Sequence, residues 1–454
     1  MEILGAIITK FQANLIMEYA EILFVALVMV IANDDSAKCR EMAAQLIRSL
    51  IERLDDERRN TFMSHLHTWS GQYTQPQLVR VSSQVYGIVI EALQTEVSPY
   101  MSVILKDVND VLKHGSEQLN AVDADDDAMD VDVDWQASYY SLIVLSKLVG
   151  AFPVLITQSN DIDWRLIVNH LLFPHAWVRT ASCRLLGTLF GASAVQIPLA
   201  DPETMDQEFS PYTRSGMKEI AQKLCTQLKS EHLDEGLSLQ VVKCLFFIGK
   251  CYALVPFQNV EEEANKDNGE DEGDEEEDTG DQQGNDLPWL FSKLSYQLRS
   301  AIIARRNRSS SKPNWFHQPL SVIRWFAAMA SHLEADVLGR FLVHILSPIY
   351  RVTEDDTIHD PKMGELKDLS TELQDLIQSK VGTTKFTQVY TQIRQGVAKV
   401  RRERKEARVL QVATNPQAAA SRKMHKNAVK KESKKRKNRE FVEGKGKLKR
   451  RREA

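Results

Sequence analysis

Cysteine, glycine and proline are all scarce in this sequence. The 454 residues include five cysteines, 20 glycines and 14 prolines. The cysteines are odd in number, they form no Cys-x-x-Cys pair, and all of them lie within apolar helical patterns. This usage argues against a secreted disulfide framework. It predicts buried, reduced thiols in an intracellular protein.

Strand patterns and catalytic motifs are also absent. No stretch alternates polar and apolar residues over a convincing length, so we expect no strands. There is no glycine-rich phosphate loop, no Gly-x-Ser-x-Gly nucleophile motif and no kinase motif set. His65 with His67, and His170 with His175, are the only histidine groupings that suggest metal, and neither has a suitable third ligand nearby. The sequence therefore predicts no enzyme, no metal site and no cofactor.

One apolar run lies near the N-terminus. Ile22 to Ala32 is uninterrupted over 11 residues and follows Glu18 and Glu21. A membrane-spanning helix needs about 20 apolar residues, and a signal peptide has a basic start and a small-residue cleavage site. We expect a buried helix here and no membrane partner.

The sequence does contain a repeated helical pattern. Pro174–Gly191 reads PHAWVRTASCRLLGTLFG, and its apolar or small residues recur at helical spacing. Pro76–Leu93 repeats the order of proline, an apolar-arginine pair, a small residue three positions later and a glycine. The cations that anchor the copies are Arg40, Arg80, Arg179, Lys243 and Arg324.

The spacing of these anchors indicates the fold class. Arg40 and Arg80 are 40 residues apart, which is typical of HEAT-type repeats of about 40–47 residues. We predict an all-α, HEAT/armadillo-like α-solenoid of helical hairpins. We also predict that Arg179 is a structural repeat position that ties neighbouring hairpins together, and not a contact to RNA.

Charge divides the chain into three predicted parts. Residues 1–380 form the α-solenoid, with acidic disordered insertions at 121–134 and 257–286. Asp123–Asp134 has seven aspartates and no base, and Glu261–Asp286 has 14 acidic residues and one lysine, so neither can bury enough apolar surface to fold. Residues 381–412 form a long C-terminal helix that is basic in its second half. Residues 413–454 form a disordered basic tail.

The basic end is the strongest chemical signal. From Lys399 to Arg452 there are 22 lysines and arginines against five glutamates, although the whole chain has a formal net charge of -5. Such clusters are typical of nuclear localisation signals and nucleic-acid contacts, because neutralised phosphates release counterions. The alternative is a solvated tail that serves only as an import signal. The residues predicted for RNA binding or nuclear localisation are Arg401, Arg402, Arg404, Lys405, Arg408, Lys430, Lys431, Lys434, Lys435, Arg436, Lys437, Arg439, Lys449, Arg450, Arg451 and Arg452.

Three segments resemble a known family. They are FQANLIMEYAEILFVALVMVIANDDSAKCREMAAQLIRSLIERLD from Phe11, HLLFPHAWVRTASCRLLGTLFG from His170 and KKESKKRKNRE from Lys430. Together they are similar to the C-terminal region of the very large HEAT-repeat component of the small-subunit processome, the "down-regulated in metastasis" family. The resemblance implies that this chain is a piece of a longer protein.

The resemblance also implies a function. It is that of a non-catalytic scaffold of ribosome biogenesis in the nucleus and nucleolus, which supports pre-18S rRNA processing. The implied partners are pre-ribosomal RNA, the particle containing small nucleolar RNA and other processome proteins; the basic tail adds nuclear import receptors. The alternative is a HEAT-repeat nuclear transport or adaptor protein that binds protein cargo through its concave surface. The basic tail favours the scaffold, because a transport receptor has little use for it.

Overall fold

The computed structural model describes most of the chain. The described residues are 2–124, 134–157, 161–193, 195–199, 209–230, 232–257, 285–306, 315–354, 361–415, 417, 420–421, 423–425, 427–432 and 434–435. The chain divides into a helical body, residues 1–259 and 279–386, and a C-terminal unit, residues 260–278 and 387–454. Each unit is described by itself below.

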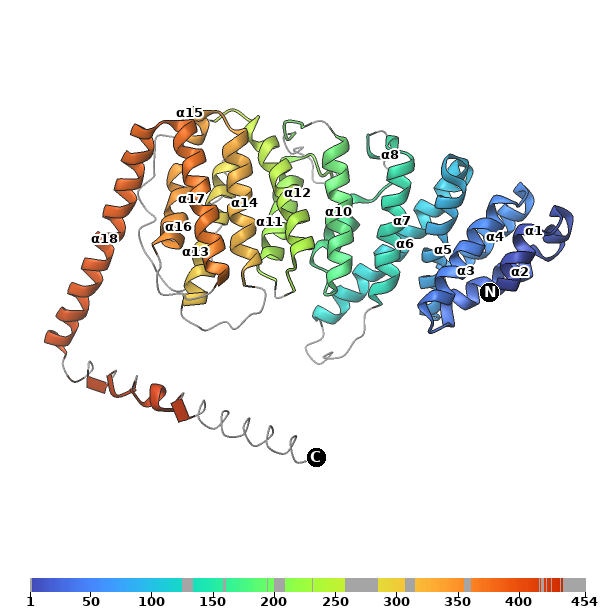
Figure 1. Cartoon of the computed structure of the whole chain (residues 1–454), viewed down its shortest axis with the longest axis horizontal. Helices are drawn as coiled ribbons and strands as arrows, with labels where there is room; N and C mark the ends of the chain where they lie inside the picture. The colour runs from blue at the N-terminus through green and yellow to red at the C-terminus, as the bar shows by residue number, and fades with distance from the viewer. Residues whose placement is uncertain are drawn as a thin grey trace. The chain divides into compact units, whose positions relative to one another are not determined.

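The described part of the body consists of helices (Figure 1). They are α1 (Glu2–Lys10), α2 (Ala13–Asn33), α3 (Ala37–Glu52), α4 (Asp56–Ser70), α5 (Pro76–Leu93), the 3-10 helix η1 (Gln94–Tyr100), α6 (Met101–Ala124), α7 (Trp135–Ala151), α8 (Val154–Thr157), α9 (Trp164–Asn169), the 3-10 helix η2 (His170–Leu172), α10 (Ala176–Ala192), α11 (Arg214–Leu228), α12 (Glu235–Ala253), α13 (Leu287–Arg306), α14 (His317–His332), α15 (Ala335–Leu338), α16 (Leu342–Thr353) and α17 (Pro361–Val381). Helix α18 (Thr383–Thr414) begins in the body and continues into the C-terminal unit.

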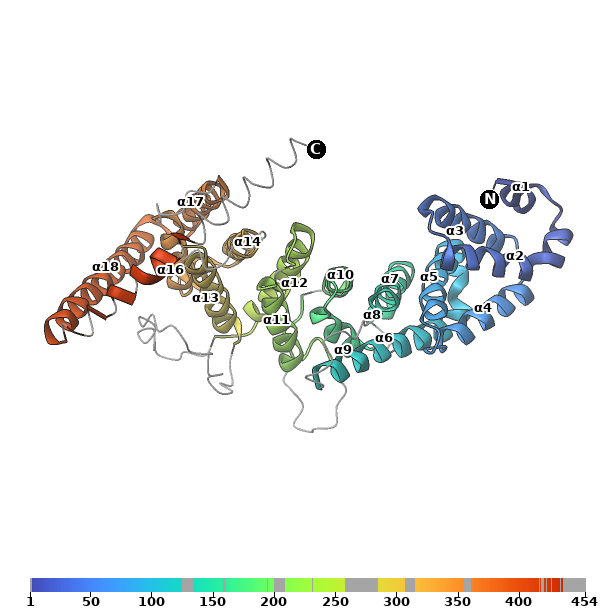
Figure 2. The same ribbon diagram turned by 90° about the horizontal axis from the view of Figure 1, so that it is seen from below.

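The helices of the body stack in two rows. The inner row runs α3, α5, α7, α10, α12, α14 and α17, and each of these helices contacts the next. The outer row runs α4, α6, α9 with η2, α11, α13 and α16, and its members pack in the same order against the inner row. Figure 2 shows the inner row on the concave side of the body. No strand occurs among the described residues, where Leu199 and Thr213 form an isolated bridge. The prediction of an all-α solenoid is confirmed.

Side-chain caps fix where many of these helices start. A serine, threonine or aspartate just before the helix accepts a hydrogen bond from a backbone N–H of the first turn, which otherwise has no partner. The residues that do so are Ser36, Asp55, Asp134, Asp163, Thr213 and Asp234. These short polar side chains fix the starts of their helices, whereas α5, which has no side-chain cap, starts at Pro76.

Aromatic rings fill the core near the end of the body. Phe291 of α13 stacks on Phe341 with ring centroids 4.3 Å apart, and meets Trp325 of α14 edge-on at 4.9 Å. Trp325 is fully buried. Offset and edge-on pairs of this kind add to the free energy gained from burial alone, so they fix how α13, α14 and the start of α16 pack.

The predicted segment boundaries can be compared with the structure at three places. Helix α6 continues to Ala124, inside the predicted insertion 121–134. The remainder of the two acidic segments, 125–133 and 258–284, lies outside the described residues. At the other end, Gly382 separates α17 from α18 with φ of +92°, a left-handed conformation that glycine adopts without steric cost. The body continues beyond this glycine to Phe386, so the division between solenoid and C-terminal helix at residue 380 stays a prediction.

Among the described residues, three helical segments are long and apolar enough to cross a membrane, judged by length and composition alone. They are Asn14–Asn33, Pro76–Leu119 and Glu235–Ala253. The apolar stretch of α2 is therefore longer than the predicted run of Ile22–Ala32. Within the body, Phe24, Leu27 and Val28 of α2 are buried, and α2 packs against α3 and α5. The absence of a membrane partner stays a prediction.

Candidate nucleic-acid interface

Helix α18 changes character at Arg401, as the sequence predicts. The apolar stripe of its first half is half-buried and consists of Phe386, Tyr390, Ile393, Val397 and Val400. From Arg401 onward every described side chain of the helix is exposed. An amphipathic stripe that stops while the helix continues leaves the following turns with no apolar face to bury. The second half of α18 therefore presents its cations to solvent.

The cations of this half are only weakly paired within the helix. Lys399 Nζ and Arg402 Nε lie 3.9 Å from carboxylate oxygens of Glu403 and Glu406, one turn along, and all four side chains are exposed. Exposed pairs at this spacing contribute about 0.3–0.5 kcal/mol. Arg401 and Lys405 have no ion-pair partner among the residues that the structure describes. The surface is thus available for phosphate groups.

The predicted tail is only partly described. Lys430, Lys431, Lys434 and Lys435 are exposed and have helical backbone, where the sequence predicts a disordered tail. The surrounding alanines, lysines and arginines are good helix formers, which explains the helical backbone. The side chain of Arg408 lies outside the described residues, as do Arg436, Lys437, Arg439, Lys449, Arg450, Arg451 and Arg452.

The anchor Arg179 has the structural role predicted for it. Its side chain is only 6% exposed, and its Nη1 donates to the carbonyl oxygens of Phe173 and Pro174 at 2.9 Å each. Arg40 repeats the arrangement, donating from Nη1 to the carbonyl oxygens of Asp34 and Asp35 at 2.7 and 3.3 Å. Both arginines thus bind the carbonyls six and five residues earlier. The bonds close a hairpin's own loop, so Arg179 is structural, but the prediction that it ties neighbouring hairpins together is wrong.

Arg80, in contrast, connects two neighbouring hairpins. Its Nε donates to Asp134 Oδ2 at 2.7 Å, and Asp134 also caps α7. Arg214 Nε likewise donates to Asp286 Oδ2 at 2.7 Å, just before α13. The last aspartate of each acidic segment is therefore a structural residue. The sequence analysis missed both because they end a long acidic run; the position directly before a helix was the available signal.

The histidines considered as metal ligands have other partners. His67 Nδ1 lies 2.8 Å from Asp107 Oδ1, and the Tyr86 hydroxyl donates to Asp107 Oδ2 at 2.5 Å. This buried carboxylate joins α4, α5 and α6. His170 is buried with Nδ1 2.8 Å from the Leu166 carbonyl oxygen, and burial lowers its pKa. The described residues contain no group of three side chains that suits a metal ion.

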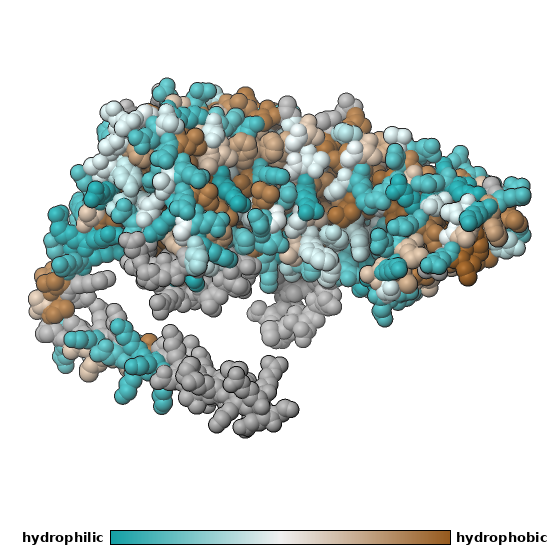
Figure 3. All heavy atoms as spheres, in the orientation of Figure 1, coloured by the Kyte–Doolittle hydropathy of each residue, from teal (hydrophilic) through white to brown (hydrophobic). Residues whose placement is uncertain are grey.

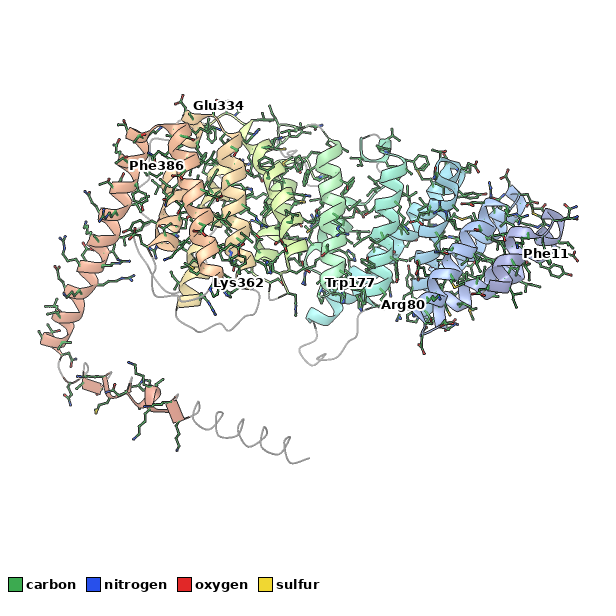
Figure 4. All side chains as sticks on the ribbon, viewed as in Figure 1. Phe11, Arg80, Trp177, Glu334, Lys362 and Phe386 are labelled. Carbon is green, nitrogen blue, oxygen red and sulfur yellow. The ribbon has the colours of Figure 1, made fainter. Side chains whose placement is uncertain are left out.

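An exposed aromatic cluster joins α7 and α10, and the sequence analysis did not single it out. Trp135 stacks on His175 with centroids 3.7 Å apart, and Trp177 stands perpendicular to both at 5.4 and 5.7 Å. Tyr139 approaches Trp177 at 5.8 Å. Trp177 is nevertheless 59% exposed. Figure 4 shows it near the same edge of the body as Arg80.

These features define an α-solenoid whose C-terminal helix continues as a basic, exposed extension. The family described as small subunit processome component 20 homolog, C-terminal, matches residues 174–440, more than half of the chain. The chain belongs to this family, which confirms the resemblance seen in the sequence. The small-subunit processome in its description agrees with the predicted setting in ribosome biogenesis and with the predicted nuclear and nucleolar localisation.

Two fungal proteins are similar along nearly the whole chain. The U3 small nucleolar RNA-associated protein 20 of Schizosaccharomyces pombe is 28% identical over 432 residues, which cover 92% of this chain and 15% of that protein. The U3 small nucleolar RNA-associated protein 20 of Saccharomyces cerevisiae is 23% identical over 443 residues, or 96% of this chain and 16% of that protein. The chain thus spans about a sixth of the length of these relatives.

Proposed function

We propose that this chain is a non-catalytic scaffold of the small-subunit processome that supports processing of pre-18S rRNA. The helical body binds other processome proteins, and the basic extension contacts pre-ribosomal RNA and the particle containing small nucleolar RNA. Family membership supports the setting. The observation that carries the RNA contact is the change along α18 from a half-buried apolar stripe to an exposed basic surface at Arg401.

The charge of the extension favours RNA binding with little sequence preference. Flexible or helical cations neutralise phosphates and release counterions, which gives strong and salt-dependent binding. The extension has few aromatic side chains, so base stacking contributes little there. We infer that its cationic clusters are also recognised by nuclear import receptors. The alternative of a transport or adaptor protein explains the solenoid but not this extension.

Removal of the tail tests the proposal. Deleting Ala420–Ala454 from the protein should abolish nucleolar accumulation and reduce recovery of precursor rRNA, while the far-UV circular dichroism of the body stays helical. Replacing Lys430, Lys431, Lys434 and Lys435 by arginine is the matched control, and because it preserves charge it should keep both properties. Unchanged RNA recovery after the deletion would refute an RNA-binding role for the tail.

A further inference from the structure

Four neighbouring helices of the inner row are nearly free of acidic residues. Helices α7, α10, α12 and α14 contain one acidic residue, Glu235. Their lysines and arginines are Lys147, Arg179, Arg184, Lys243, Lys250 and Arg324. A surface with cations of this kind and almost no carboxylates attracts polyanions. These four helices therefore carry a net positive charge that is separate from that of the extension.

Some of these cations are already engaged inside the body. Arg179 binds loop carbonyls, as described above. Lys147 Nζ lies 2.8 Å from Glu91 Oε1, and Lys250 Nζ lies 5.6 Å from the ring centroid of Phe246. The other three, Arg184, Lys243 and Arg324, have no ion-pair partner in the described part of the chain. Arg184 and Lys243 are exposed, and Arg324 is half-exposed.

The three uncompensated cations lie at similar levels on successive helices. A Cβ added at Gly187 of α10 would lie 3.8 Å from Cys244 Sγ of α12, and a Cβ at Gly249 of α12 would lie 3.2 Å from Trp325 of α14. Arg184, Lys243 and Arg324 each lie within two turns of these contacts. Packed helix axes are about 8–10 Å apart. The cations therefore form a line across α10, α12 and α14.

Trp177 supplies a rigid aromatic surface beside this line. It lies two turns before Arg184 on the same face of α10, because a spacing of seven residues returns to one side of a helix. Trp135, Tyr139 and His175 pack around it, so the space behind the indole is filled and the exposed part is flat. No ring stacks parallel on Trp177 among the described aromatic pairs. Figure 3 shows hydrophobic side chains exposed among hydrophilic ones over the middle of the body.

We propose that this surface binds single-stranded RNA, with a base stacked on Trp177 and phosphates held by Arg184, Lys243 and Arg324. A flat, exposed indole beside unpaired cations matches the combination that single-stranded nucleic acids require. An acidic peptide would share the charge complementarity, but its apolar side chains need a pocket, and the packed rings leave none behind Trp177. The proposal rests on the RNA association proposed above and assigns it a second site.

RNA titrations of the full chain test this site separately from the tail. In every protein used, all the cations predicted above for RNA binding, from Arg401 to Arg452, are changed to glutamine, and the probe is a labelled oligouridine single strand. Trp177→Ala should weaken binding by about 5- to 150-fold, the range for loss of one base stack. Trp177→Phe keeps a ring and should retain most of the affinity. Phe11→Ala removes an equally exposed ring at the far end of the body and is the control.

The cations are tested by salt dependence. The triple variant Arg184→Gln, Lys243→Gln and Arg324→Gln should reduce the slope of log K against log salt by about 2, since each single-strand phosphate contributes about 0.7. Lys38→Gln, on the exposed surface of α3, should leave the slope unchanged. If neither Trp177→Ala nor the triple variant changes RNA affinity, the body site is rejected while the tail site stands. Binding of polyglutamate with the same Trp177 dependence would identify an acidic-peptide site and reject the RNA site.

Discussion

At the scale of single residues, two arginines of the repeat, Arg40 and Arg179, are held by backbone carbonyls. Arg40 and Arg179 use one guanidinium nitrogen to join two consecutive carbonyl oxygens of the loop that precedes their helix. A loop between packed helices has carbonyls without intrahelical partners. Arg40 and Arg179 satisfy such carbonyls, and this explains why each lies just inside the second helix of its hairpin.

Arg179→Met should destabilise the body by about 1–3 kcal/mol. Methionine keeps most of the buried volume but donates no hydrogen bond, so two carbonyl oxygens lose their partner. Arg184→Met, on the exposed face of the same helix, should change the unfolding free energy by less than about 0.5 kcal/mol. Urea unfolding followed by circular dichroism measures both. Equal effects of the two substitutions would contradict the structural role of Arg179.

The buried His170 makes stability depend on pH. Burial lowers the pKa of His170 below its ordinary value, so the folded chain excludes a proton that the unfolded chain binds near pH 6.5. The unfolding free energy contributed by this group is therefore complete above about pH 6.5 and is lost as pH falls below it, by up to about 1.4 kcal/mol per pH unit. His170→Asn should flatten the stability profile between pH 7 and pH 5. If the unfolding free energies of the two proteins change in parallel with pH, His170 is not the source of the pH dependence.

At the scale of elements, helices were predictable wherever the apolar period and a cap agree. α7 has both, with Asp134 as its cap, and α5 has the apolar period with Pro76 in its first turn, where proline favours the start of a helix. The pairing of helices into hairpins could be predicted from the repeated sequence pattern. The short α9 and η2 were not predicted. Their nine residues are divided between two helix types, which is too short a stretch for a periodic apolar pattern to be recognised. The aromatic cluster was not predicted either, because Trp135 and Trp177 come together only when α7 packs on α10.

Close packing of the inner row depends on one glycine. A Cβ on Gly249 of α12 would lie 2.9 Å from Met329 Sδ and 3.2 Å from the Trp325 ring of α14. The ring is fully buried and cannot turn away, so Gly249→Ala should cost about 1–3 kcal/mol. Gly191→Ala places its new Cβ where no atom lies within 4 Å, so it should be neutral or slightly stabilising. Thermal unfolding of both variants tests this, and a stabilised Gly249→Ala protein would contradict the packing.

At the scale of the whole molecule, charge is sorted by part of the chain. Helices α7, α10, α12 and α14 and the second half of α18 present cations, while two segments that end in structural aspartates hold 21 of the 62 acidic residues. The composition alone hides this segregation of charge, because the formal net charge of the whole chain is only -5. The sequence showed the basic end directly, since the clusters are continuous. The line of Arg184, Lys243 and Arg324 became visible only when the fold placed three helices side by side.

Crosslinking of the protein to RNA in cells tests the scaffold function most directly. Ultraviolet irradiation, purification of the tagged protein and sequencing of attached RNA should give reads on the precursor of the small-subunit rRNA. Mass spectrometry of the attached peptides should place the contacts in the second half of α18, in the tail and around Trp177. An absence of RNA crosslinks to this chain would contradict the account.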